Sequence, residues 1–200
     1  MDDQDFWNAR YAGPDYLYGT EPNSFLAEHA ELLTGPVLSL CEGEGRNAVF
    51  LARRGLQVLG VDCSETGLRK AQALARSRKV TIETHLADLA EYTPGKMAFG
   101  SVISISAHLP GAVRQRLYPR IEKSLKANGI FVLEAYTENQ LTKHTGGPKD
   151  SDMLMSIDKL RNELPNLNVV LAREIDRLVV EGKGHTGMAS VVQFIARKEA

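Results

Sequence analysis

Short apolar runs alternate with helical patterns between residues 37 and 134. The runs are rich in Val, Ile and Leu and are bounded by glycine, proline or polar residues, which is typical of buried strands. They predict five strands, at residues 37–40, 57–61, 80–85, 99–105 and 130–134. Because helical segments separate these strands, we expect crossover connections and therefore a parallel sheet with helices on both faces.

The helical segments begin and end at recognisable residues. Ser64 is a candidate N-cap for the helix after the second strand, and Gly55 ends the helix before that strand. Residues 111–126 carry an apolar side chain at every fourth position, which predicts a helix with a kink at Pro119. A last helix is predicted at residues 152–164, where a following proline stops it.

The last part of the chain has a different pattern. Residues 169–180 and 188–197 are two β-rich runs joined by the loop EGKGHTG, with no helical segment between them. Two strands joined in this way pair as an antiparallel hairpin. The complete prediction is an α/β fold with a doubly wound, seven-stranded, mostly parallel Rossmann-like sheet that ends in this hairpin. Ligands of such sheets bind at the carboxyl ends of the strands.

The segment CEGEGRN, residues 41–47, forms the turn between the first predicted strand and its helix. Residues 43–48, GEGRNA, fit the pattern G-x-G-x-x-G/A, and Asp62 follows about 20 residues later, as in a nicotinamide-dinucleotide site. The two glutamates argue against a pyrophosphate: at ~5 Å and an effective dielectric of ~20, each opposes it by roughly 3 kcal/mol. S-adenosylmethionine, which carries a sulfonium and an ammonium group and no phosphate, would instead be attracted by Glu42 or Glu44.

Composition and charge narrow the partners. The formal net charge is -1 and no basic groove signature is present, so we expect neither nucleic acid nor a membrane as a partner. No apolar run reaches ~18 residues and the acidic N-terminus lacks a signal-peptide core, which predicts a cytoplasmic protein. Cys41 and Cys63 lie outside any metal-ligand spacing, so we expect reduced thiols and no metal. The sequence does not indicate an oligomeric state.

Several motifs match one enzyme family over nearly the whole chain. They are WNARY at 7–11, YGTEPN at 18–23 with Phe25 and Leu26, EGEGRN at 42–47, Val61 with Asp62, ADL at 87–89, and residues 104–109. In these motifs the chain resembles the tellurite-resistance-type methyltransferases, a small-molecule branch of the class I S-adenosylmethionine-dependent enzymes near the thiopurine methyltransferases. The resemblance implies a single methyltransferase domain over 1–200, with 1–34 as an N-terminal helical or lid segment, 35–135 as the cofactor-binding core and 136–200 as the substrate-side loop, helix and hairpin.

The resemblance also implies a cofactor site, residue by residue. Gly43 and Gly45 would let the backbone approach the methionine portion of S-adenosylmethionine, and Arg46 and Asn47 would lie against the same end. Asp62 would bind the ribose. The other implied contacts, to the adenine or to the floor of the site, come from Cys63, Ala87, Asp88, Leu89, Ser104 and Ser106, in addition to Glu42 and Glu44 of the turn.

Two positions depart from the family's pattern. Ser39 stands where relatives have an acid, and Cys41 stands where they have a glycine. A glycine would supply backbone freedom that a cysteine lacks. We hypothesise from the balance of charge that Glu42 supplies the missing acid.

The acceptor is expected beside the ends of the fourth and fifth strands. His108 is the candidate catalytic residue, with a packing role as the alternative, and Glu134 and Tyr136 either face the acceptor or only pack. His144 and His185 lie in glycine-bearing loops without metal-ligand spacing and are expected at the surface. The loop 145–150 is either a substrate lid or a plain connection, and an N-terminal aromatic group either closes over the sulfonium or docks on the sheet: Trp7, Tyr11, Tyr16 and Tyr18.

These expectations combine into one predicted function. The protein transfers a methyl group from S-adenosylmethionine, leaving S-adenosylhomocysteine, to a small-molecule substrate. Thiols and selenium or tellurium species are favoured because they ionise readily and need no dedicated base. Two alternatives stay open: a non-catalytic module that binds S-adenosylmethionine or S-adenosylhomocysteine, and an NAD(P)-dependent reductase. The chain reads SISAHLPG after the fourth strand, without the [DN]-P-P-[YFW] stretch of amino-group DNA methyltransferases, which disfavours nucleic-acid methylation.

Overall fold

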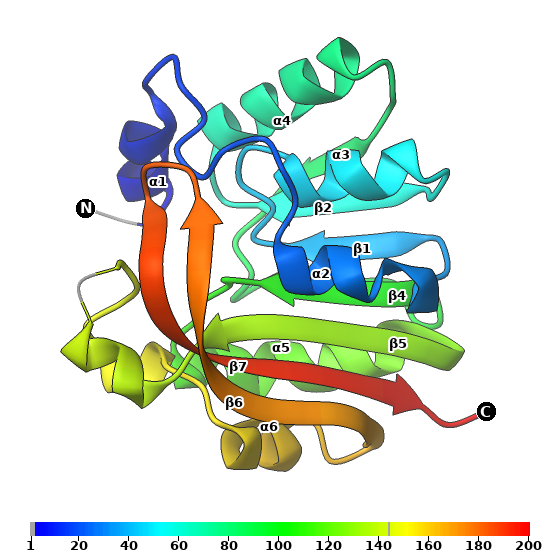
Figure 1. Ribbon diagram of the computed structural model, residues 1–200. Helices are drawn as coiled ribbons and strands as arrows, with labels where there is room; N and C mark the ends of the chain where they lie inside the picture. The colour runs from blue at the N-terminus through cyan, green and yellow to red at the C-terminus, as the bar shows by residue number, and fades with distance from the viewer. Residues whose placement is uncertain (1–2, 144) are drawn as a thin grey trace.

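A seven-stranded sheet in the order β3-β2-β1-β4-β5-β7-β6 runs through the computed structural model, which describes residues 3–143 and 145–200 (Figure 1). The first five strands run parallel, whereas β7 runs antiparallel to both of its neighbours, β5 and β6. The predicted fold class, including the closing hairpin, is confirmed. The strands are β1 (Val37–Leu40), β2 (Val58–Asp62), β3 (Glu83–Leu86), β4 (Phe99–Ile105), β5 (Leu125–Tyr136), β6 (Leu167–Glu181) and β7 (His185–Lys198).

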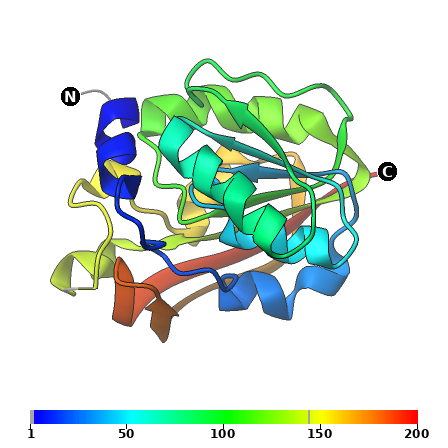
Figure 2. The ribbon, with the colours of Figure 1, turned by 90° about the horizontal axis from the view of Figure 1, so that it is seen from above.

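Helices cover both faces of the sheet because successive strand residues point to opposite faces. On one face, Val37 belongs to the same core as apolar residues of α2 (Ser24–Glu28), α3 (Arg46–Arg53) and α4 (Glu65–Ser77). On the other face, Leu38 shares a core with residues of α5 (Gly111–Ser124) and α6 (Ile157–Glu163). Figure 2 shows the sheet between these two layers, with α1 (Asp3–Tyr11) beside one end of it.

The element boundaries correct three expectations. Strand β3 begins at Glu83 and strand β5 at Leu125, instead of the predicted residues 80 and 130. The helix predicted at 152–164 is shorter: it begins at Ile157, after the N-cap Ser156, whose hydroxyl accepts a hydrogen bond from the Lys159 amide. The reason lies in the preceding backbone, because the Met155 amide donates to the Tyr136 carbonyl at 2.8 Å and is not available to a helix. Three short 3₁₀ helices complete the chain: η1 (Ala30–Leu32), η2 (Glu138–Thr142) and η3 (Ser151–Met153).

The end of the hairpin lies against the N-terminal segment. We call residues 181–187, which include the end of β6, the turn and the start of β7, the hairpin tip. The Gly184 amide donates to the Leu17 carbonyl at 3.0 Å, and a Cβ on Gly182 would lie 2.4 Å from that same carbonyl. Figure 1 shows the tip beside α1, at the opposite end of the hairpin from the C-terminus of the chain. The hairpin therefore brings its tip to the carboxyl ends of the parallel strands.

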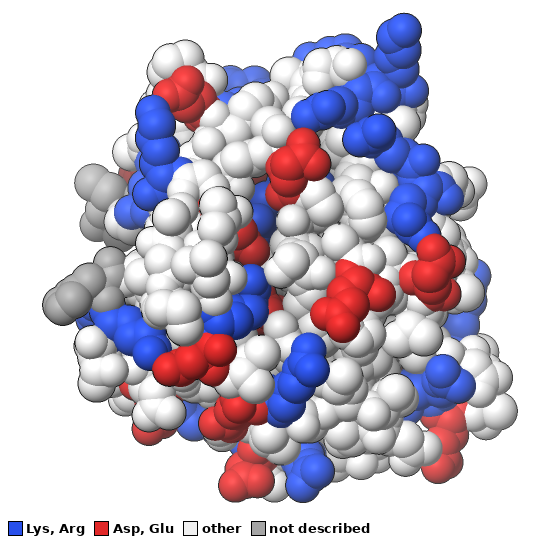
Figure 3. Space-filling view, in the orientation of Figure 1, with Lys and Arg blue, Asp and Glu red and all other residues white. Residues whose placement is uncertain are grey.

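The surface carries charges of both signs. In the view of Figure 3 acidic and basic side chains are interspersed, apart from a group of Lys and Arg beside α3 and α4. Within the part of the chain that the structure describes, no helix has both the length and the apolar character needed to cross a membrane.

Candidate cofactor and acceptor site

A cavity of about 840 Å³ lies at the carboxyl ends of the parallel strands. It is lined by α1, the glycine turn, the ends of β2 and β3, the segment after β4, residues 146–148 and the hairpin tip. A cavity of this size is large enough for a cofactor together with a small second ligand. Chain segments that are far apart in the sequence therefore meet around one space.

The two glycines of the turn have different reasons to be glycine. Both have positive φ, +59° at Gly43 and +96° at Gly45. A Cβ on Gly45 would lie 2.6 Å from the Ala71 Cα in α4, so this glycine allows two helices to pack closely. Gly43 lines the cavity, and a Cβ there would lie 2.8 Å from the Tyr11 hydroxyl. Of the two, only Gly43 lies where a ligand would approach, whereas the resemblance implied that role for both.

Asp62 ends strand β2 and ties it to the glycine turn. Its carboxylate accepts hydrogen bonds from the Gly43 amide and the Ser64 amide, both at 2.8 Å. Burial raises the pKa of Asp62, and these backbone donors oppose that effect. Asp62 and the next residue, Cys63, both line the cavity.

Glu42 turns back toward the strand that precedes it. Its carboxylate accepts hydrogen bonds from the Ser39 hydroxyl and, at 2.9 Å, from the Ala48 amide. Gly60 on β2 makes room for it, because a Cβ there would lie 2.8 Å from Glu42 Cγ. Burial raises the pKa of Glu42 to about 7. This contact puts the Glu42 carboxylate beside Ser39, the position where the family pattern has an acid. That Glu42 replaces this acid in binding the cofactor stays a hypothesis.

Cys41 adopts the backbone conformation that its usual glycine would favour. Its φ is +50°, in the left-handed region that costs an L-residue roughly 1–2 kcal/mol. Both cysteines line the cavity, and both are free. Burial raises the pKa of each thiol, to about 12 for Cys63, so neither has the thiolate character of a reactive cysteine.

The remaining side chains of the turn are held by other parts of the chain. Glu44 accepts a hydrogen bond from the Leu17 amide at 2.7 Å and pairs with Lys70 of α4. Asn47 accepts a hydrogen bond from the Asn23 amide at 3.0 Å. Arg46 Nη2 donates to Glu181 Oε2 at 2.6 Å, while its Nη1 is buried and meets no hydrogen-bond partner among the described residues. All three residues line the cavity.

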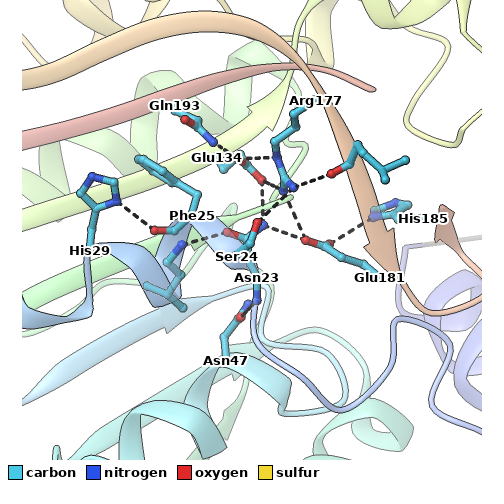
Figure 4. A network of polar contacts seen from close by, with 12 residues as sticks. Asn23, Ser24, Phe25, His29, Asn47, Glu134, Arg177, Glu181, His185 and Gln193 are labelled. Atoms are coloured by element: carbon cyan, nitrogen blue, oxygen red, sulfur yellow. Dashed lines mark hydrogen bonds and ion pairs between the residues drawn. The ribbon is translucent and has the colours of Figure 1, made fainter. Parts of the chain in front are cut away.

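A buried polar network joins Asn23, Glu134, Arg177 and Glu181 (Figure 4), and Arg46 is connected to it through Glu181. Asn23 Nδ2 donates to Glu134 Oε1 at 2.7 Å and to Glu181 Oε1 at 2.8 Å. Arg177 donates its Nε hydrogen to Glu134 Oε2 at 3.0 Å and also pairs with Glu181. The sequence did not reveal this network, because its members are up to 158 residues apart and follow no local pattern. Glu134 belongs to the network and is not among the residues that line the large cavity, so of its two predicted roles it has the packing one.

Other predicted cofactor contacts divide into two groups. Asp88, Leu89 and Ser106 line the cavity. Ala87 and Ser104 do not: the Ala87 amide pairs with the Asp62 carbonyl at 3.0 Å, and Ser104 is buried inside β4. For Ser104 the reason is the alternation of strand residues along β4, whereas Ala87, which follows β3, packs against the apolar core.

His108 lies where the acceptor was expected. Its ring stacks on Tyr136, with centroids 5.1 Å apart and an interplanar angle of 5°. Both ring nitrogens are buried without a hydrogen-bond partner among the described residues, and burial lowers the pKa of His108 to about 3. The imidazole is therefore neutral at physiological pH and a weak base.

The surface position predicted for His185 is wrong. It is 8% exposed and lines the cavity together with Gly146, Gly147 and Pro148. The tight turn of the hairpin tip folds its ring inward, against the rings of Tyr18 and Tyr136 at 4.5 and 5.3 Å. His144 lies outside the described residues.

Aromatic residues from the N-terminus close one side of the cavity. Trp7, Tyr11 and Tyr18 line it, and the Trp7 and Tyr11 rings stack at 5.4 Å. Tyr16 does not line it: the Tyr16 hydroxyl donates to the Lys70 carbonyl at 3.1 Å. The helix α1 also docks on the core, since Asn8 Oδ1 accepts hydrogen bonds from the Ser64 hydroxyl and the Thr66 amide at 2.8 and 3.1 Å. The N-terminal segment thus docks on the core and also lines the cavity, while closure of its rings over a sulfonium stays a prediction.

Comparisons with known proteins show that the chain is similar to methyltransferases. Residues 37–129 match the family described as "Methyltransferase domain". Over 158 residues the chain is 25% identical to the 2-heptyl-1-hydroxyquinolin-4(1H)-one methyltransferase of Mycobacteroides abscessus, covering 72% of this chain and 70% of that protein. Over 100 residues it is 35% identical to an uncharacterized methyltransferase of Synechocystis sp., covering 48% of this chain and 45% of that protein.

Solved structures share the fold at low sequence identity. A protein from the study of the conversion of a disulfide bond into a thioacetal group during echinomycin biosynthesis has a TM-score of 0.80 at 19% identity, over 99% of this chain and 92% of that one. TehB from Haemophilus influenzae has a TM-score of 0.70 at 14% identity, over 98% and 67%. The magnesium protoporphyrin IX methyltransferase of Synechocystis, solved with bound S-adenosylhomocysteine, has a TM-score of 0.64 at 17% identity, over 98% and 83%.

Proposed function

We propose that the chain, an S-adenosylmethionine-dependent methyltransferase by its sequence matches, methylates a small molecule through a soft, easily ionised nucleophile. A thiol or a selenium or tellurium species is the preferred acceptor. The reductase alternative is set aside because the matched relatives are methyltransferases. The observation that carries the proposal is the contrast between the two halves of the cavity, one rich in carboxylates and the other apolar with a neutral histidine.

The carboxylate-rich half suits the cofactor. In this proposal Asp62 accepts hydrogen bonds from the ribose hydroxyls and Asp88 and Leu89 contact the adenine, which is supported by the position of all three in the lining of the cavity. The unpartnered Nη1 of Arg46 suits the carboxylate of the methionine portion. A pyrophosphate would meet Glu42 and Asp62 with unfavourable charge, whereas a cationic ligand would not.

The apolar half suits an acceptor that needs little help to ionise. Its lining includes Ile105, Leu109, Val113 and Met153, together with His108. S-adenosylmethionine supplies an electrophilic methyl group, so the protein has to orient the nucleophile and exclude water. With a pKa of about 3, His108 is too weak a base to deprotonate an alcohol or an amine, but its neutral ring still has an N–H that can donate to an anion.

The relatives set the range of acceptors to be tried. The resemblance to the tellurite-resistance-type methyltransferases points toward tellurium and selenium species. The Mycobacteroides relative acts on a 1-hydroxyquinolin-4-one, whose N-hydroxyl group is also readily ionised. An acidic hydroxyl therefore belongs in the same panel as the thiols.

A ligand-binding experiment tests the cofactor first. S-adenosylhomocysteine should raise the melting temperature of the protein, NADH should not, and Asp62→Ala should remove the effect. Stabilisation by NADH alone would overturn the cofactor assignment. Release of S-adenosylhomocysteine is then followed with thiol, selenite, tellurite, 1-hydroxyquinolone and amine acceptors. Turnover with the thiol, selenium or tellurium acceptors is expected, and turnover with the amines alone would contradict the soft-nucleophile proposal.

A further inference from the structure

His185 lies between the buried network and the acceptor half of the cavity. Its Nδ1 is 3.9 Å from Glu181 Oε2 (Figure 4). The other edge of the ring faces the loop 146–148, because a Cβ on Gly146 would lie 3.0 Å from His185 Cδ2 and 3.5 Å from Nε2. His185 and Gly146 both line the cavity. One ring nitrogen thus faces a carboxylate, while the other lies on the side of the cavity.

Aromatic contacts place this histidine at the acceptor end. The Tyr136 ring stacks on His108 at 5.1 Å and meets the His185 ring edge to face at 5.3 Å. Tyr18 packs on His185 from the N-terminal side at 4.5 Å. The two histidines are close enough that a positive charge on His185 contributes to the low pKa of His108, after the larger effect of burial. Both therefore face the same end of the cavity, and only His185 has a carboxylate behind it.

The carboxylate of Glu181 is well prepared to stabilise an imidazolium. Burial alone would raise the pKa of Glu181, but hydrogen bonds and charges from His185, Arg46 and Asn23 outweigh it and hold the pKa well below its usual range. Glu181 is therefore ionised throughout the physiological pH range. At 3.9 Å from Nδ1 the Glu181 carboxylate is too far for a hydrogen bond, but its charge favours the tautomer with the hydrogen on Nδ1, which leaves Nε2 able to accept a proton.

We propose that His185, with Glu181 behind it, takes the proton of a protic acceptor, such as a thiol, a selenol or an acidic hydroxyl, during methyl transfer. The inference rests on the proposed function. The acceptor's bond to hydrogen breaks and the proton moves to His185 Nε2, while the electron pair left on the acceptor atom forms the bond to the methyl carbon. The carbon–sulfur bond breaks with its electrons remaining on sulfur, so the products are the methylated acceptor, a neutral thioether and a proton that His185 returns to water.

A series of thiol acceptors tests this role through their own acidity. At pH 7.5, His185→Gln should lower kcat/KM by about 100-fold for thiols with pKa near ~10 and by no more than about 3-fold for thiols with pKa near ~5, which are already ionised. His185→Phe, which keeps an aromatic ring between Tyr18 and Tyr136, should show the same selective loss. His85→Gln, at an exposed histidine of β3 outside the cavity, is the matched control. An equal loss for every thiol would mean that His185 only supports the structure, and would overturn the proposal.

Two further readouts do not depend on turnover. S-adenosylhomocysteine affinity, measured by calorimetry, should stay within about 3-fold of the unsubstituted protein in His185→Gln; if the unsubstituted protein does not bind S-adenosylhomocysteine, the proposed function fails, independently of His185. A nitrogen-15 NMR spectrum of His185 in the ligand-free protein should show the tautomer that carries its hydrogen on Nδ1, and a smaller share of that tautomer in Glu181→Gln. An unchanged tautomer ratio in a folded Glu181→Gln protein would contradict the pairing.

Discussion

The glycine turn and the hairpin tip line the same cavity, but their buried carboxylates are held in different ways. Glu42 and Asp62 are held mainly by nearby backbone: the Ala48 amide lies six residues from Glu42, and the Ser64 amide lies two residues from Asp62. Glu181 is held by Arg46 and Asn23, which are 135 and 158 residues away. The first kind of site can form wherever the turn forms. The second exists only when the hairpin has folded back onto the sheet.

The largest effect is expected at the hairpin tip. Glu181→Ala leaves Arg46 and Arg177 with less of their buried counter-charge, so the free energy of unfolding should fall by about 3–5 kcal/mol. Because its folded-state pKa is depressed, Glu181 contributes stability above its unfolded pKa of ~4.3, and that contribution is lost as the pH falls below it. Urea unfolding of both proteins at several pH values measures this.

The hairpin tip also provides the control. Lys183 pairs with Asp15 at 2.7 Å, but both side chains are largely exposed. Lys183→Ala should therefore change the free energy of unfolding by no more than about 1 kcal/mol. Similar losses for Lys183→Ala and Glu181→Ala would show that burial of the Arg46–Glu181 pair has no special effect.

Glu42 should show the opposite dependence on pH. Its pKa is raised from 4.5 to about 7 by burial, so the folded state binds more protons than the unfolded state between these values. Stability from this group therefore falls as the pH rises from 4.5 to about 7, by up to ~3 kcal/mol, and Glu42→Gln removes that dependence. Unfolding free energies at pH 5 and pH 8 test it. Equal slopes for the two proteins would rule out the raised pKa.

The smallest effect is expected at Cys41. Cys41→Gly and Cys41→Ala remove the same thiol and differ in one methyl group at φ +50°, so the glycine variant should be more stable by up to ~1 kcal/mol. Ala73, exposed in the middle of α4, has ordinary helical geometry, and Ala73→Gly should instead lose ~1 kcal/mol. If glycine were unfavourable at both positions, the left-handed backbone at Cys41 would carry no strain.

Predictions from the sequence succeeded where the signal was local. The apolar runs indicated the strands and the hairpin, and Ser64 caps α4 as expected, with its hydroxyl accepting from the Gly67 amide at 3.0 Å. The helix predicted at 152–164 lost its first turn because the Met155 amide pairs with Tyr136, which belongs to another element. His185 was expected at the surface because a glycine-bearing loop gives no sign of which segment will cover it.

The sequence by itself determined the α/β alternation and the glycine turn with Asp62 at the end of β2, and its charges argued against a phosphate-bearing cofactor without excluding one. These features depend on residues that are close together in the chain, so their spacing can be read from the sequence alone. The tertiary structure alone decided which polar groups meet inside: Asn23, Arg46, Glu134 and the β6 pair Arg177 and Glu181 come from four separate segments. Buried charges must find partners wherever the fold brings them. The same tertiary contacts place His185 beside Glu181 at the cavity, a position that no local sequence pattern predicts.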